Sequence, residues 1–174
     1  FILIREWLKE SQNDIPEYLN EIIFNLGQAY NFSWQNTNQS FLFNGNHVVD
    51  NSNFDKYLKF HGYKFKNENN ECGGYIILKN KNILLTADIG FAPEKKFSNN
   101  YQSGTLSFEI YFKGKKLISN SGYFQNYKHQ LNSISRSTAS HSTLTIDNRS
   151  STNPVKNTIN KLIIIEIPVL NSCI

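Results

Sequence analysis

Residues 99–124 of the chain read NNYQSGTLSFEIYFKGKKLISNSGYF, and this stretch decides the fold. Its alternate positions carry apolar side chains at Leu106, Phe108, Ile110 and Phe112. Alternation with a period of two is the pattern of a β-strand with one apolar and one polar face. A lysine-rich turn at residues 113–116 and a second strand-like run follow, so the stretch predicts an antiparallel pair of strands.

Short strand-like runs divided by turn signals continue on both sides of this stretch, from Gly73-Gly74 onward. A series of short strands with regular turn signals is typical of a β-sandwich. We therefore predict a mainly β fold, an antiparallel β-sandwich, with a second tight turn at residues 79–82. The strands are expected at residues 75–78, 83–88, 105–112, 116–119, 142–146 and 161–167.

The first 28 residues have a different pattern, with apolar side chains at helical spacing before and after Pro16. Asp14 is the expected cap and Pro16 the expected first turn of the second helix, with Gly27 as its end. Two short amphipathic helices cannot bury their apolar faces alone, so they predict a helical neighbour. Further on, residues 41–43 predict a short strand entering an Asn44-Gly45 turn, and residues 54–60 one or two helical turns.

The composition of the chain limits the functions that it can have. The chain has 174 residues, 39% hydrophobic content and a net charge of +4, which fits a folded domain. Its lysines are scattered and not interleaved with aromatic residues, which argues against nucleic-acid binding. No apolar run is long enough for a membrane span. Cys72 and Cys173 leave open whether a disulfide or two thiols are present, and the absence of Met together with the apolar last residues predicts a fragment.

The order of these pieces resembles the C-terminal β-sandwich domain of heparinase II/III-type polysaccharide lyases. Besides residues 99–146, the resemblance rests on SFLFNGN at 40–46 as a junction segment and on GGYIILKNKNILLTADIG at 73–90 as the first hairpin. It implies three parts: residues 1–28 as the remnant of an α-helical toroid, 29–72 as the junction, and 73–174 as a sandwich incomplete at its C-terminus. The rest of the toroid is expected in the full-length protein.

The resemblance also implies an activity. Enzymes of this kind are carbon–oxygen lyases that cleave uronic-acid polysaccharides by β-elimination. A base removes the proton α to the carboxylate, and an acid protonates the leaving oxygen. An acidic polysaccharide or oligosaccharide is the implied partner, and the periplasm or cell envelope the implied location. Because the family places most of its catalytic residues in the toroid, activity of this chain alone is left open.

The same resemblance implies a metal position. A His-x-His-like element of the family falls on Asn100 and Gln102 here, and in some relatives its second His binds zinc with a later Asp and His. Those positions fall on Gln102, Asn120 and His141. Neutral amides are poor zinc ligands, whereas they hydrogen-bond well to an imidazole. We therefore expect no cofactor, and a buried polar network around His141 instead of zinc.

The candidate catalytic residues are Tyr101, Arg136 and His141. Asn100 cannot act as a general acid or base near neutral pH, whereas the neighbouring Tyr101 could carry a proton. Arg136 could bind a substrate carboxylate through two parallel hydrogen bonds. The alternatives are a merely packed tyrosine and an arginine in a structural salt bridge or an exposed loop.

The remaining polar residues give weaker indications of a functional site. His47, His61 and His129 share no metal-ligand spacing and are expected to be surface or hydrogen-bonded residues. A hydrolase triad of Ser140 or Ser142 with His141 and Asp147 is rejected, because no nucleophile elbow is present. The competing functions are a non-catalytic carbohydrate-binding or structural module, favoured by abundant Asn, Gln, Tyr and Phe, and a truncated, inactive remnant.

Overall fold

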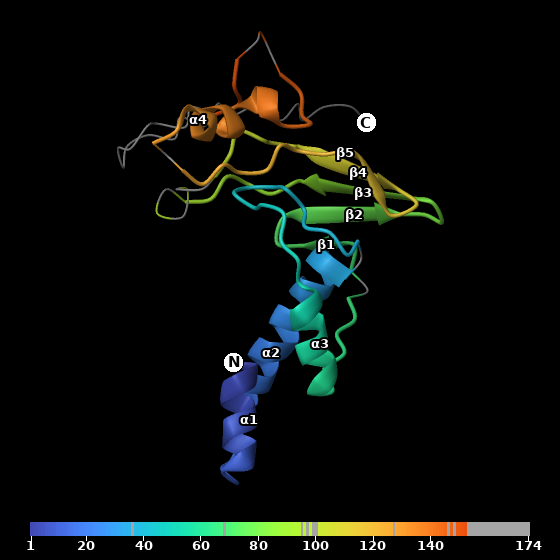
Figure 1. Ribbon diagram of the computed structural model, residues 1–174, viewed down its shortest axis with the longest axis vertical. Coiled ribbons are helices and arrows are strands. Elements are labelled where there is room, and N and C mark those ends of the chain that lie inside the picture. Colours follow the sequence, from blue (N-terminus) through green and yellow to red (C-terminus); the bar gives the residue numbers. More distant parts are fainter. Residues whose placement is uncertain are drawn as a thin grey trace, which may run out of the picture. The chain divides into compact units, whose positions relative to one another are not determined.

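The computed structural model describes residues 1–35, 37–67, 69–94, 96, 98, 101–126, 128–145, 147 and 149–152 (Figure 1). The chain forms two compact units. The first comprises Phe1–Phe41 and Val48–Gly73, and the second Leu42–His47 and Gly74–Ile174. Each unit is described by itself below.

The first unit is helical. Helix α1 spans Ile2–Glu10, α2 spans Glu17–Tyr30 and continues into a π-helix at Asn31–Gln35, and α3 spans Ser52–Phe60. The two predicted N-terminal helices and the helix near residues 54–60 are confirmed. Helix α2 begins after Pro16, whose extended backbone (φ −61°, ψ 136°) makes it the N-cap. The side chain of Asp14 is therefore not the cap that the sequence predicted.

Gly27 does not end α2, which corrects the predicted boundary. It lies inside the helix and is buried. A β-carbon at Gly27 would come within 2.1 Å of the Phe65 ring, so glycine is present here to let that ring pack against the helix. The core of this unit is formed by Leu19, Ile23, Phe32, Trp34, Phe41 and Leu58.

The β structure is a five-stranded sheet in the order β1-β2-β3-β4-β5, with antiparallel pairing between successive strands from β2 to β5 (Figure 1). The predicted antiparallel β fold is thus confirmed. The strands are β1 Glu71–Cys72, β2 Tyr75–Lys79, β3 Ile83–Asp88, β4 Phe108–Phe112 and β5 Lys115–Ile118. Lys113 and Gly114 both have positive φ (47° and 77°), the geometry of a tight hairpin turn between β4 and β5.

Three strand predictions need correction. Strand β4 begins three residues later than predicted, because Leu106 turns the chain at φ 58° and the Ser107 N–H donates to the Gly104 carbonyl. Residues 41–43 form no strand, although the Asn44-Gly45 turn that follows them is present. Residues 142–145 form no strand either, since the Ser142 N–H is bonded to the Asn120 side chain. The strand predicted at 161–167, together with Cys173, lies outside the described residues.

Two short helices lie between β5 and residues 142–145. Helix α4 spans Gln130–Arg136, and a 3-10 helix follows at Thr138–Ser140. Nδ1 of His129 accepts from the Leu131 N–H at 3.2 Å and so caps α4. His129 is therefore a hydrogen-bonded residue, one of the two outcomes expected of it.

The buried face of the sheet carries several polar side chains beside the apolar Ile77 and Leu84. Thr86 and Asp88 of β3 and Glu109 and Tyr111 of β4 are buried on one face, with Thr86 directly opposite Glu109 in the register. The apolar positions of β4 belong to the other face, where Phe112 remains 40% exposed. The alternation in residues 105–112 therefore predicts the strand correctly, but its polar face is the one turned inward, toward the candidate site.

Candidate functional site

The structure brings two of the three residues of the predicted polar network into direct contact. Nδ1 of His141 lies 3.3 Å from Oδ1 of Asn120, and the same oxygen accepts the Ser142 N–H at 3.0 Å. Gln102 is fully buried and donates from Nε2 to the carbonyls of Gly122 (3.1 Å) and Ser135 (3.3 Å).

The segments before and after the β4–β5 hairpin, together with the 3-10 helix, position this cluster. Gln102 precedes β4, Asn120 follows β5, and His141 follows the 3-10 helix. Gly104 supports the His141 ring, because a β-carbon there would lie 3.2 Å from the ring atom Cγ. A side chain at this position would therefore require the imidazole to shift by a few tenths of an ångström.

Glu109 holds Asn120 in place and was not predicted from the sequence. Its carboxylate accepts hydrogen bonds from the Asn120 N–H (3.1 Å), the Tyr111 hydroxyl (2.9 Å) and the Ser119 hydroxyl (3.2 Å). Nζ of Lys116 completes the set at 3.1 Å. Glu109 has no exposed surface, so these four donors replace water around a buried charge. The only signal in the sequence is the closeness of a lysine-rich turn to a strand glutamate.

The protonation of His141 follows from its partner. The Ser142 N–H fixes Oδ1 of Asn120 as an acceptor, so Nδ1 of His141 must carry the proton that it donates. Burial lowers the pKa of His141, and the nearby Ser135 carbonyl opposes this only in part. A neutral imidazole with its proton on Nδ1 keeps a lone pair on Nε2.

The residues at the family's metal position do not fit a zinc ion. With Oδ1 of Asn120 occupied by two donors, the other end of this amide presents an N–H group, which cannot coordinate a cation. Gln102 offers one neutral amide oxygen and His141 one nitrogen. Among the described residues, no three His, Cys, Asp or Glu side chains gather in a way that could hold a metal.

Tyr101 belongs to a neighbouring cluster built around Asp88. Nδ2 of Asn44 donates to Oδ2 of Asp88 at 2.6 Å and lies 3.0 Å from the Tyr75 hydroxyl, while the Gly90 N–H donates to Oδ1 of Asp88. Tyr101 is 8% exposed, and burial, assisted by the negative charge of Asp88, raises the pKa of its hydroxyl. Its phenol therefore stays protonated at neutral pH.

Arg136 contacts the main chain next to the candidate site. Its Nε and Nη2 both donate to the backbone carbonyl of Tyr101, at 3.3 and 3.1 Å. The pair of hydrogen bonds expected for a substrate carboxylate is thus made with a main-chain oxygen. Arg136 consequently fixes the Tyr101–Gln102 segment in place. It forms no salt bridge with the residues that the structure describes, and its side chain is only partly exposed.

The other predicted positions lie elsewhere. Nδ1 of His47 is 3.2 Å from Nε2 of Gln125, and Nδ1 of His61 is 4.0 Å from Oε2 of Glu6. Both histidines thus have polar neighbours, as was expected of them. Asn100 lies outside the described residues. None of the helices in the described part of the chain is long and apolar enough to cross a membrane.

Comparison with solved structures gives the class of fold. Heparinase III with methylated lysines is 17% identical, with a TM-score of 0.61, and the match covers 78% of this chain and 25% of that one. A mutant of the heparan sulfate lyase HepC from Pedobacter heparinus is 19% identical, with a TM-score of 0.58, and the match covers 79% and 26%. The chain thus spans about a quarter of the length of these solved chains. No curated protein sequence matches it.

The family follows from the sequence match. The family described as "Heparinase II/III-like, C-terminal" matches residues 69–163, more than half of the chain. The chain therefore belongs to the heparinase II/III-like C-terminal family, and the resemblance seen in the sequence is confirmed.

Proposed function

We propose that the chain is the β-sandwich part of a polysaccharide lyase that cleaves a uronic-acid-containing polysaccharide by β-elimination. The observation that carries this proposal is the family match over residues 69–163. It is supported by the likeness of the fold to heparinase III and to a heparan sulfate lyase. The net charge of +4 is compatible with an anionic substrate.

In this reaction the proton α to the substrate carboxylate is removed, the bond to the leaving oxygen breaks, and a carbon–carbon double bond forms. We assign the protonation of the leaving oxygen to Tyr101, because its hydroxyl carries a proton at neutral pH. Arg136 acts as a positioning residue, since it holds the Tyr101 backbone. His141 has its Nε2 buried and likewise acts by position, through Asn120.

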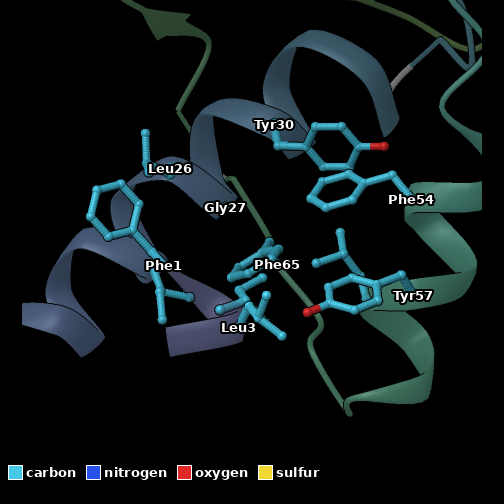
Figure 2. Close-up of a pocket in the computed structure, with 11 residues that line it drawn as sticks. Phe1, Leu3, Leu26, Gly27, Tyr30, Phe54, Tyr57 and Phe65 are labelled. Carbon is cyan, nitrogen blue, oxygen red and sulfur yellow. The ribbon is translucent and has the colours of Figure 1, made fainter. Parts of the chain in front are cut away.

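The helical unit is proposed to be the end of a larger helical domain. Its apolar pocket of about 430 Å³ is lined by aromatic side chains that include Tyr30, Phe54 and Tyr57 (Figure 2). Tyr30 and Phe54 meet edge to face, with ring centroids 5.0 Å apart. Trp7 of α1 is also 59% exposed. Apolar surface of this extent is normally covered by further protein, and the missing helices of the toroid are the occupant that we propose.

The test uses the longest native form of the protein and a panel of acidic polysaccharides that includes heparin-like and alginate-like chains. Absorbance in the ultraviolet band of unsaturated uronates should rise with at least one of them. A folded sample that produces no such rise with any polysaccharide would overturn the lyase proposal. Dye binding tests the helical part separately, because the 174-residue chain should bind more hydrophobic dye than the longer form.

A second function is favoured by the amide side chains of the site. Gln102 and Asn120 cannot exchange protons near neutral pH, so the described buried cluster is better suited to structural support than to proton transfer. A non-catalytic carbohydrate-binding module would retain acidic polysaccharide on a column and yet release no unsaturated product. Retention without product would therefore favour this second function, and a sample that neither binds nor cleaves would contradict both.

A further inference from the structure

We propose that a lysine cluster at one end of the sheet binds acidic polysaccharide at a place separate from the candidate site. The cluster consists of four exposed lysines in and beside two turns: Lys79, Lys81, Lys113 and Lys115. The inference rests on the proposed function for the kind of polymer, because acidic polysaccharide is the substrate proposed there. It adds the place where the polymer is held beyond the bond that is cleaved.

The sheet brings the two turns together although they are distant in the sequence. Ile83 of β3 pairs with Phe112 of β4. Directly beyond this pair, the Lys113 N–H donates to the Asn82 carbonyl at 2.7 Å. Figure 1 shows the β2–β3 turn and the β4–β5 turn at the same end of the sheet. Neighbouring strands lie about 4.8 Å apart, so this end extends over about 14 Å from β2 to β5, which suits a polymer better than a single small anion.

The lysine cluster has no acidic partner close to it. Residues 78–84 and 111–117 contain no Asp or Glu. Strands β2 to β5 carry two carboxylates: Glu109 is fully buried and pairs with Lys116, and Asp88 lies at the opposite end of β3. None of the four lysines forms a salt bridge with a residue that the structure describes. Like charges held together repel one another, so a bound anionic polymer lowers their energy.

The side chains around the cluster favour a polysaccharide over a nucleic acid. An ammonium group binds carboxylate or sulfate as a point charge and does not need the planar fork of arginine. Single-stranded nucleic acids are commonly bound by exposed aromatic rings on which their bases stack. The rings of residues 111–117 do not offer such a surface. Tyr111 is buried, and Nζ of Lys113 lies 5.3 Å from the ring centroid of Phe112.

The lysine cluster is separated from Tyr101 by the length of a strand. Asp88, whose negative charge acts on the Tyr101 hydroxyl, is the last residue of β3, whereas the cluster adjoins the first residue, Ile83. The strand has six residues. At about 3.4 Å per residue its two ends are about 17 Å apart. Substitutions in the lysine cluster should therefore weaken the binding of long chains without changing the chemistry at Tyr101.

The first experiment locates the bound polymer on the unaltered protein. Lysine acetylation, read by mass spectrometry, is compared in the longest native form with and without a long heparin-like or alginate-like chain. Acetylation of the four lysines should slow several-fold, whereas the exposed Lys9 and Lys59 of the helical unit should react as before. Unchanged reactivity of the cluster while polysaccharide is bound would overturn the proposal. Equal protection by single-stranded DNA at the same concentration would overturn the choice of polymer.

The second experiment replaces all four lysines of the cluster by glutamine in the longest native form. Affinity for the long polysaccharide at low salt should fall at least about tenfold, and the difference from the unaltered protein should shrink as salt is added. Cleavage of a short oligosaccharide should keep its rate. The matched control replaces four exposed lysines of the helical unit by glutamine and should keep the affinity: Lys9, Lys56, Lys59 and Lys64.

The outcomes separate this inference from the proposed function. Equal loss of affinity in the two variants would mean that only net charge matters, which overturns the lysine cluster as a binding surface. Full affinity of the cluster variant, with cleavage intact, would contradict the lysine cluster alone. An unaltered, folded protein that neither binds nor cleaves any acidic polysaccharide would contradict the proposed function as well.

Discussion

Nδ2 of Asn44 donates a hydrogen bond of 2.6 Å to Oδ2 of Asp88, the last residue of β3. Asn44 has a left-handed backbone (φ 45°) and leads a turn with Gly45. The preceding Phe43 stacks on Tyr75, with ring centroids 5.4 Å apart. This hydrogen bond and this ring contact together attach the segment Leu42–His47 to the end of the sheet where Tyr75 and Asp88 pair.

The substitution Asn44→Gly tests this attachment. Glycine tolerates the left-handed backbone, so the variant removes the amide without adding strain. Loss of a hydrogen bond to a buried carboxylate should lower the free energy of unfolding by about 1–3 kcal/mol, measured by urea denaturation. Gln12→Gly is the matched control, because Gln12 also has positive φ (55°) but is exposed. Equal effects of the two substitutions would show that the Asn44–Asp88 bond contributes nothing.

The pH dependence of stability should report on Asp88. Burial raises the pKa of this carboxyl above its ordinary value of 3.8, against the opposing hydrogen bonds from Asn44 and Gly90. A carboxyl whose pKa is higher in the folded chain contributes stability below its ordinary pKa, and this contribution is lost as the pH rises through the folded value. The unaltered protein should therefore lose more stability than Asp88→Asn as the pH rises from about 3.8. Parallel stability curves for the two proteins would contradict this.

The strands show which parts of the fold can be predicted from local pattern. Strand β3 lies at the predicted residues 83–88, because its apolar run is bounded by a turn on one side and Gly90 on the other. Helix α4 could not be predicted in this way. Its sequence offers only Leu131 and Ile134 at helical spacing. It is stabilised by distant polar contacts, such as the 2.6 Å hydrogen bond from Nδ2 of Asn132 to the Phe124 carbonyl.

The candidate site likewise contains residues that could be predicted from the sequence and one that could not. Resemblance to the family located Asn120 and His141, which the structure joins by a hydrogen bond. Glu109 escaped prediction, since a glutamate between two apolar strand positions is expected to face solvent. It is buried because four donors from separate parts of the hairpin converge on it, and no local pattern encodes such an arrangement.

The pair of Glu109 and Lys116 should behave as one unit. Glu109→Gln leaves the Lys116 cation beside a neutral amide, and Lys116→Met leaves the carboxylate without its cation. Breaking a buried ion pair from one side should cost about 3–5 kcal/mol of unfolding free energy. The double variant should cost clearly less than the sum of the two single variants, measured as a double-mutant cycle. Additive effects would mean that the two side chains do not interact energetically.

Tyr101→Phe tests the proposed acid of the lyase reaction. The substitution removes the proton that we assign to the leaving oxygen, so the rate of unsaturated product formation by the longest native form should fall about 10²-fold with little change in KM. Circular dichroism checks that the variant is folded. Tyr18→Phe, at a side chain that is 63% exposed, is the control and should keep the full rate. Full activity of Tyr101→Phe would remove Tyr101 from the mechanism.

Gly27→Ala should destabilise the protein, although replacing a glycine inside a helix by alanine usually stabilises it. In the middle of a helix, alanine is ordinarily more stable than glycine by about 0.5–1 kcal/mol. Here the new β-carbon would lie 2.1 Å from Cδ1 and Cε1 of Phe65, whose ring borders the same pocket as Gly27 (Figure 2). Such overpacking should lower the free energy of unfolding by about 1–3 kcal/mol.

The matched background for this test is Phe65→Ala, which removes the ring that the new methyl group would strike. In that background Gly27→Ala should become neutral or stabilising, because only its ordinary helical advantage remains. Urea denaturation of the four chains measures the difference. If Gly27→Ala costs the same with and without the ring, contact with Phe65 is not the reason for glycine at this position, and another feature of α2 must require it.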